Sequence, residues 1–447
     1  MPFRPVSLFL GLLAIVVASA AAPARAQLAF IRDAEIESII RSYASPLFEA
    51  AGLDAQTVEV HIVNSRQINA FVAGGKKLFL NTGLLLAAKD SNQVVGVIAH
   101  ETGHIAGGHL ARTHDVLRSA NAATILSYVL GAAAIVAGAP DAAMAILGAG
   151  SAISQKTFLQ YSRGQEQAAD QFAVTVLDRT GQSARGLYEF LEILEDQEVL
   201  VASRQDPYLR THPLVRGRVN FVRNHVENSS YSSVVPSAAQ EAQFARMIAK
   251  LRGFLNPREA FREYPDEDQS VAARYARSIA HYRRPDLVAA LAEIDSLLAD
   301  YPEDGYFHEL KGQILFENGR IDDAMEPYSR AVEKLPQEPL IRVGLAQVMV
   351  ERGDAAAIDS AIEHLAIAIR QDAGYPLAWR LLSIAYGRTG RLGLSSLASA
   401  ERAILVGGYE EAIAFAKRAG DLLPAGAPGQ LRAQDIEFAA KQAMNKK

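Results

Sequence analysis

Two histidines and one glutamate in His100-Glu101-Thr102-Gly103-His104 have the types and spacing that metal-dependent hydrolysis requires. Histidines four residues apart share one face of a helix, so both imidazoles could reach one zinc ion at about 2.0–2.1 Å. Glu101 lies off the line of the two ligands and could take a proton from a zinc-bound water. The pattern therefore predicts one catalytic zinc ion held by His100 and His104, with Glu101 as the general base.

A catalytic zinc ion needs a third protein ligand and one open position. His109 follows His104 by five residues, but on a continuing helix its side chain would be turned about 140° away. Glu166 is the better candidate, because Asp170 comes one turn later on the same face of a predicted helix. A carboxylate in that place can hold a histidine ligand from behind, although spacing alone would also fit an exposed Glu/Asp pair.

A small sheet and several helices must position these residues. Apolar spacing predicts an amphipathic helix at 31–52, and alternating segments predict strands at 57–63, 69–72 and 77–80. Gly74-Gly75 suits a hairpin turn between the last two strands. The metal-binding motif falls on a helix predicted from Gln93 to about His114, capped by Ser91 or Asn92. Further helices are predicted at 158–180, 183–194 and 214–225.

Residues 120–153 form a stretch that is almost entirely apolar or small. Its many alanines and glycines make it a weak membrane span. We expect a buried helical hairpin or a lid over the site, with peripheral contact to a membrane surface as the alternative.

The composition fits an exported, folded protein. The 447 residues are 49% hydrophobic and 21% charged, which predicts a folded body of more than one domain. Residues 1–26 have a basic start, an apolar run and an Ala24-Arg25-Ala26 cleavage site, as in a secretory signal peptide. The lack of cysteine excludes disulfides and thiolate ligands and favours a bacterial periplasm. A net charge of −5 argues against nucleic-acid binding.

The C-terminal part of the chain repeats. Pro302 and Pro336 stand 34 residues apart. Between them, small and aromatic residues occupy the positions of a tetratricopeptide repeat, and they are Gly312, Gly319, Ala324, Tyr328 and Ala331. Later units keep the pattern, with about three residues inserted near residues 355–357, and an earlier unit around Tyr275 is more degenerate. About four such repeats would stack into a curved solenoid whose concave face binds polypeptides.

Taken together, these motifs resemble the HtpX/BepA-type zinc metalloproteases. The resemblance rests on the His100 to His104 motif with His109, on Glu166-x-x-x-Asp170 after Ser162-Arg163, and on Thr211-His212-Pro213 followed by Arg218. With the leader and the repeats it is closest to the BepA type, a periplasmic protease and chaperone. It implies a mainly α fold with a small β-sheet, in which a zincin-like metalloprotease domain precedes an α-solenoid of tetratricopeptide repeats.

The resemblance also implies roles for single residues. Glu166 would be the third zinc ligand, and Asp170 would hold a histidine ligand from behind. His212 would stabilise the tetrahedral intermediate or bind zinc as a fourth ligand in a latent state. Arg218 would support that region. From the residues alone, His212 before Pro213 would count as structural.

The predicted activity is hydrolysis of peptide bonds in the periplasm. By resemblance, the substrates are unfolded or misassembled exported proteins, which would add as a β-strand to the edge formed by Asn69, Ala70 and Phe71. The repeats would act as a chaperone and contact the outer-membrane assembly machinery. The alternative is mainly a chaperone or assembly scaffold with a latent zinc site capped by His212.

The expected domain organisation follows from these motifs. A signal peptide at 1–26 precedes a zinc metalloprotease domain at 27–235, a helical connection at 236–267, the repeats at 268–430 and a tail at 431–447. The boundary after the protease domain is placed at the polar, Ser-rich residues 227–236.

Overall fold

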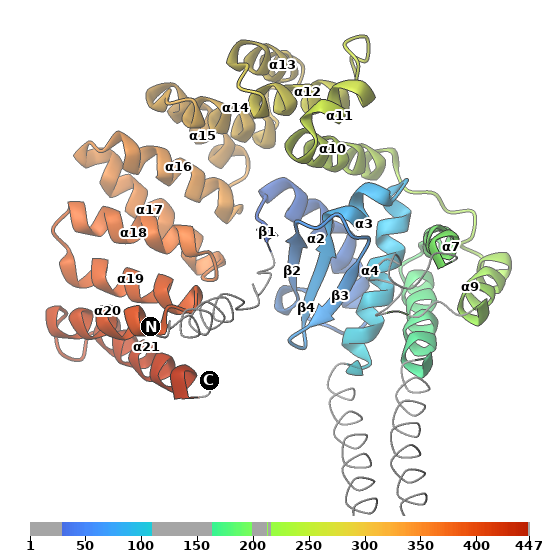
Figure 1. Cartoon of the computed structure of the whole chain (residues 1–447), viewed down its shortest axis with the longest axis horizontal. Helices are drawn as coiled ribbons and strands as arrows, with labels where there is room; N and C mark the ends of the chain where they lie inside the picture. Colours follow the sequence, from blue (N-terminus) through green and yellow to red (C-terminus); the bar gives the residue numbers. More distant parts are fainter. Residues whose placement is uncertain (1–28, 110–162, 199–211, 213–215, 446–447) are drawn as a thin grey trace, which may run out of the picture.

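The computed structural model describes residues 29–109, 163–198, 212 and 216–445 (Figure 1). This part is mainly helical with one small sheet, as predicted, and the sheet has four strands. Pairs of helices, from α12 (Val271–Arg283) to α21 (Pro428–Asn445), curve in an arc beside the domain that holds the sheet. The expectations for the signal peptide and for residues 120–153 fall outside the described residues. None of the described helices is long and apolar enough to cross a membrane.

The sheet contains the three predicted strands and a short additional one. Its order is β1 (Phe30–Ile31), β2 (Glu59–Val63), β4 (Lys77–Asn81) and β3 (Ala70–Ala73). β2 and β4 run parallel, whereas β3 and β4 form an antiparallel hairpin. The turn uses Gly74 and Gly75 at φ of 58° and 87°, values that glycine adopts without strain. β3 is therefore at one edge of the sheet in the described part of the chain.

One face of the sheet packs on helices. Val60, Ile62, Leu78 and Leu80 alternate with outward residues and are buried in the core of this domain. Against them pack α2 (Ala34–Ala50) and α4 (Ser91–Ala106), and α4 also lies beside β3. α3 (Thr82–Ala87) follows β4 directly. The predicted helix at 31–52 is thus present as α2, and its apolar side faces the sheet.

α4 carries the metal-binding motif, but its ends differ from those predicted. Asp90, rather than Ser91 or Asn92, caps the helix, because its carboxylate accepts a 2.9 Å hydrogen bond from the Gln93 amide. The helix ends at Ala106 and does not continue to His114. Gly107 and Gly108 follow, and Gly108 has a φ of 60°, which terminates the helix as glycine commonly does.

Glycines let two helices approach α4 closely. A Cβ on Gly96 would lie 2.5 Å from the Leu187 amide nitrogen in α7 (Arg185–Glu198). A Cβ on Gly103 would lie 3.0 Å from Ala169 Cα in the helix that covers 163–179. Glycine has a low helix propensity, but Gly103 allows the two helices to cross closely. This crossing brings Glu166 next to His100 and His104.

Five helix pairs form the repeat array. The first helices are α12, α14 (Gly305–Glu317), α16 (Pro339–Arg352), α18 (Pro376–Arg388) and α20 (Tyr409–Leu422). Their starting residues are 34, 34, 37 and 33 apart, in agreement with the predicted period. The second helices are α13 (Leu287–Asp300), α15 (Ile321–Lys334), α17 (Ala355–Gln371), α19 (Leu392–Leu405) and α21. α17 has 17 residues where α15 has 14, which is the predicted insertion.

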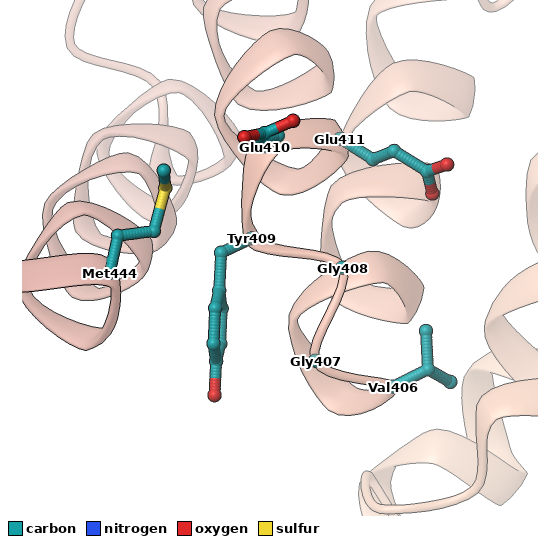
Figure 2. A pocket seen from close by; sticks show the side chains of 7 residues that line it. All are labelled: Val406, Gly407, Gly408, Tyr409, Glu410, Glu411 and Met444. Atoms are coloured by element: carbon teal, nitrogen blue, oxygen red, sulfur yellow. The ribbon is translucent and has the colours of Figure 1, made fainter. Parts of the chain in front are cut away.

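The last pair extends further than expected. Residues 431–445, predicted as a tail, form most of α21. Ala433, Ile436 and Ala440 have helical spacing and are buried against the preceding helices. A pocket of about 530 Å³ lies where Gly407 and Gly408 connect α19 to α20, with Met444 of α21 on its other side (Figure 2).

Two helices connect the sheet domain to the repeats. α10 (Ala238–Leu255) packs on α2, α3 and α4 with one side and on α12 with another, and α11 (Pro257–Glu263) follows it. Ionised groups are buried at this junction. Lys250 lies 2.9 Å from Asp33 and 3.3 Å from Glu35, and the Tyr275 hydroxyl donates to Glu35 at 2.7 Å. Since these contacts join α2, α10 and α12, this cluster couples the first turn of α2 to the repeats.

Candidate metal centre

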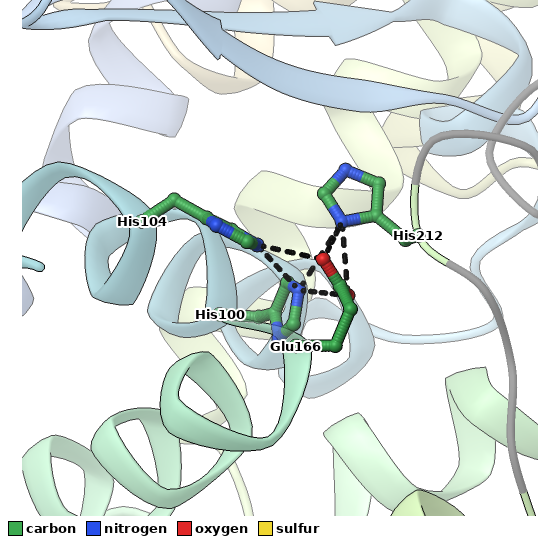
Figure 3. A group of neighbouring side chains, drawn as sticks. All are labelled: His100, His104, Glu166 and His212. Carbon is green, nitrogen blue, oxygen red and sulfur yellow. Dashed lines mark hydrogen bonds and ion pairs between the residues drawn. The ribbon is translucent and has the colours of Figure 1, made fainter. Parts of the chain in front are cut away.

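Four side chains from three separate segments meet at one point (Figure 3). His100 and His104 project from α4, Glu166 from the helix at 163–179, and His212 from the loop before α9 (Arg216–Asn228). Each offers one donor atom, and all four atoms lie within 4.8 Å of one another. His100, Glu166 and His212 are buried, and His104 is partly buried. The fold has therefore gathered three imidazoles and a carboxylate away from water.

Five of the six distances between the four residues' donor atoms are close to those around a tetrahedral metal ion. His100 Nε2 lies 3.1 Å from His104 Nε2 and 3.4 Å from His212 Nδ1. The Glu166 carboxylate lies 3.3 Å from His100, 3.4 Å from His104 and 3.2 Å from His212. Ligands at about 2.0–2.1 Å from a tetrahedral zinc ion are about 3.3–3.4 Å apart. The donor set and these five distances therefore suit that ion, and all four donor atoms lie within 4.8 Å of one another.

A buried ion pair between Asp170 and Arg218 contacts two of the donor residues, His100 and Glu166. Asp170 Oδ1 lies 2.9 Å from Nδ1 of His100, so Nε2 of the same ring is directed at the other donors. Arg218, on the first turn of α9, donates to both Asp170 oxygens at 2.6 and 2.9 Å. The same guanidinium reaches Glu166 at 2.9 Å. All of these side chains are at most 3% exposed, so Arg218 links the two carboxylates inside the protein.

His109 supports the second histidine of the motif. Its Nδ1 lies 3.0 Å from Nδ1 of His104, on the side away from the other donors. The Gln165 side-chain amide donates a 2.9 Å hydrogen bond to the main-chain carbonyl of His109. A Cβ on Gly107 would overlap the His109 ring. The prediction of a continuing helix placed His109 away from His104 and is wrong, because α4 ends before it.

Glu101 is enclosed beside the donors. Its side chain is fully buried, and Oε1 lies 3.5 Å from Nε2 of His212. Among the described residues neither carboxylate oxygen of Glu101 has a hydrogen-bond partner. Burial raises the pKa of Glu101, and this effect outweighs the nearby His212 and His100. A buried carboxyl with a raised pKa is the kind of group that can exchange a proton near neutral pH.

The other ionisable groups respond to their partners. Burial alone would raise the pKa of Glu166, but His212 and His100 outweigh it and lower that pKa strongly. Burial would likewise lower the pKa of His100, but Asp170 and Glu166 raise it to about 9.

The predicted strand edge lies beside the cluster. Asn69 precedes β3, and Ala70 and Phe71 are its first two residues. Asn69 and Ala70 are buried, whereas Phe71 is partly exposed. In Figure 3 the ribbon of the sheet passes above the four side chains, and β3 is the strand in contact with α4.

Asp170 was expected to contact a histidine ligand, and in the structure that histidine is His100. The sequence did not predict that Arg218 bridges Asp170 and Glu166, or that His109 contacts His104. The Gly107-Gly108 pair could have indicated the end of the helix and hence the return of His109.

Comparisons with known proteins agree with this arrangement. Residues 31–226 match peptidase family M48, and residues 275–339 match a tetratricopeptide repeat. The chain is 27% identical over 416 residues to the beta-barrel assembly-enhancing protease of Yersinia pestis, covering 91% of this chain and 84% of that protein. It is 26% identical to the protein of the same name from Escherichia coli K12, covering 90% and 82%.

A shorter relative matches a smaller share of the chain. It is metalloprotease LoiP of Escherichia coli K12, at 28% identity over 39% of this chain and 65% of that protein. Family M48 peptidases depend on a divalent metal ion, and the four-donor cluster lies inside the matched segment. The chain is therefore a metalloendopeptidase in which an M48 peptidase domain at residues 31–226 precedes tetratricopeptide repeats, and over most of its length it is similar to the beta-barrel assembly-enhancing proteases.

Proposed function

We propose that the chain is a zinc-dependent endopeptidase that uses His100, His104 and Glu166 as metal ligands. The observation that carries this proposal is the convergence of buried donor atoms 3.1–3.4 Å apart. Nitrogen and carboxylate ligands in a tetrahedral arrangement are typical of catalytic zinc. A zinc ion held there would polarise the scissile carbonyl and acidify the attacking water.

The side chains supply the proton transfers and the positioning. Glu101, with its raised pKa, takes the proton from the attacking water and returns it to the leaving amine. Asp170 fixes the His100 ring so that Nε2 faces the metal position. Arg218 holds Asp170 and Glu166 in place. His212 lies 3.5 Å from Glu101; in this proposal it turns away from the donor cluster and donates to the developing oxyanion.

The test is proteolysis of an unfolded substrate by Glu101→Gln. This variant should still bind zinc, because Glu101 is not among the four donors, but should lose cleavage by a factor of roughly 10²–10⁴. Glu49→Gln, an exposed glutamate of α2, is the matched control and should cleave as wild type does. Full activity of Glu101→Gln would disprove the assignment.

A latent resting state is the second candidate, and one observation favours it. Nδ1 of His212 sits 3.2 Å from Glu166 and 3.4 Å from His100, close enough to fill the position that substrate needs. In this proposal the protein acts mainly as a chaperone until His212 is displaced. The variant His212→Ala distinguishes a latent site from a catalytic role of His212. Increased cleavage supports a latent site, and decreased cleavage supports oxyanion stabilisation.

We further propose that the substrates are exported outer-membrane proteins that are unfolded or misassembled, and that the protein acts in the periplasm. The relatives named for beta-barrel assembly match about 90% of this chain, repeats included. The repeats form a curved array of the type that binds polypeptides. Degradation of an unfolded outer-membrane protein, compared with an unfolded cytoplasmic protein of the same length, tests this. Equal rates for the two would contradict the substrate class.

A further inference from the structure

Four aromatic rings form a continuous row across the sheet. Phe30 of β1 lies 5.7 Å from His61 of β2, measured between ring centroids. His61 stacks on Phe79 of β4 at 4.9 Å, and Phe79 stacks on Phe71 of β3 at 4.8 Å. The planes of Phe79 and Phe71 are within 7° of parallel. The row therefore crosses every strand of the sheet and ends at β3.

The strand register puts these rings on the face opposite the helices. His61 is directly opposite Phe79, and Phe71 is opposite Phe79 on the other side. Their neighbours Val60, Leu78 and Ala70 alternate to the other face and are buried. Phe79 is 8% exposed between its two neighbours, whereas Phe71 remains partly exposed at the end of the row.

The hydrogen-bond pattern of the hairpin leaves part of the β3 backbone facing outward. The Asn81 amide donates to the Asn69 carbonyl at 2.9 Å. In an antiparallel ladder such pairs alternate, so the amide and carbonyl of Phe71 face β4. Those of Ala70 and Val72 consequently face the outer edge, where an added strand would pair with them.

We propose that Phe71 selects an aromatic side chain in the substrate. This inference rests on the proposed peptidase activity and on the expectation, given by the resemblance, that an extended polypeptide adds to the strand edge formed by Asn69, Ala70 and Phe71. A substrate strand that pairs antiparallel with Ala70 and Val72 places one residue directly opposite Phe71 in a non-hydrogen-bonded pair. Side chains approach most closely in such pairs. That residue points to the same face as Phe71, so an aromatic ring there becomes the fifth in the row.

The row makes this position rigid and apolar. Phe79, which itself stacks on His61, holds the Phe71 ring by stacking, so little side-chain freedom is lost when a substrate ring packs on Phe71. Glu59 and Lys77 share the face but pair with each other at 2.8 Å, so they offer no unpaired charge for a charged residue opposite Phe71. The substrate class is therefore an extended segment with an aromatic residue at one fixed distance from the cleaved bond.

The experiment is a positional scan of a peptide that the protein cleaves. Serine and phenylalanine are placed in turn at each position, and kcat/KM is measured for each pair. Wild type should prefer phenylalanine by about three- to tenfold at one position. Phe71→Ala should reduce that preference below about twofold, and Phe71→Tyr should retain it. Phe30→Ala, at the far end of the row, is the matched control and should also retain it.

The outcomes separate this inference from the proposed function. Cleavage without an aromatic preference at any position, or an unchanged preference in Phe71→Ala, overturns the role of Phe71 alone. Cleavage that survives Glu101→Gln overturns the proposed function instead. Phe71→Leu keeps the apolar volume without a ring, so it replaces Phe71→Ala if thermal unfolding shows that the alanine variant does not fold.

Discussion

Replacement of Asp170 with asparagine should weaken both the fold and metal binding. The Asp170 carboxylate contacts His100 at 2.9 Å and Arg218 at 2.6 and 2.9 Å, and it is 1% exposed. Loss of its charge removes one buried ion-pair partner of Arg218, while the contact of Arg218 with Glu166 stays. Breaking a buried pair costs about 3–5 kcal/mol, and we expect the lower end of this range because Glu166 still faces the guanidinium. For a domain of this size, 3 kcal/mol corresponds to a decrease in melting temperature of roughly 6–12 °C.

The effect on the metal has a different origin. Asparagine can keep a contact with His100 Nδ1, but it no longer carries the negative charge that increases the basicity of the ring. Loss of such a partner typically reduces metal affinity by about 10–100-fold. Competition with a chelator of known zinc affinity measures this directly, and thermal unfolding of the metal-free protein measures the effect on stability.

Asp178→Asn is the matched control. Asp178 also lies on the helix at 163–179 and also pairs with a histidine, His225, at 3.1 Å, but the two side chains are 33% and 23% exposed. Exposed pairs contribute about 0–1 kcal/mol, so this variant should unfold within a few degrees of wild type and bind zinc normally. If Asp170→Asn behaves in the same way as Asp178→Asn, the reasoning about the buried pair is wrong.

Two further predictions concern the repeats. A Cβ on Gly344 would lie 2.6 Å from Tyr328 Cε1, so Gly344→Ala should destabilise the array by about 1–3 kcal/mol. A Cβ on Gly420 would meet nothing within 4 Å, so Gly420→Ala should stabilise the array by about 0.5–1 kcal/mol. Urea unfolding of the two variants measures both effects. Equal changes in the free energy of unfolding would contradict the packing argument. Burial raises the pKa of Glu309 to about 8, against the opposing effect of Lys250. The unfolded chain binds fewer protons between pH 4.5 and 8, so stability falls as pH rises through this range. The melting temperature of Glu309→Gln should fall less between pH 6 and 9 than that of wild type. An equal fall in the two proteins would refute the raised pKa of Glu309.

Local patterns determined much of this protein. The spacing of His100 and His104 predicts their shared helical face, because a turn of helix repeats every 3.6 residues. Alternation predicts β2, β3 and β4, and Gly74-Gly75 predicts the turn. The proline spacing predicts the repeat period, since each repeat is a local helix pair. All of these features depend on residues close together in the chain.

The tertiary structure decided which distant residues meet. Nothing in the spacing of Glu166 distinguishes an exposed helical carboxylate from a metal ligand, and the contact of Ala169 with Gly103 brings it to the cluster. Arg218 is separated from Asp170 by 48 residues, and their ion pair exists because α9 packs where it does. The aromatic row likewise depends on strand order, which places β4 between β2 and β3. The sequence alone therefore determines the helices, the strands and the chemistry of the motif, whereas packing over long separations determines the full set of donors and the face that meets the substrate.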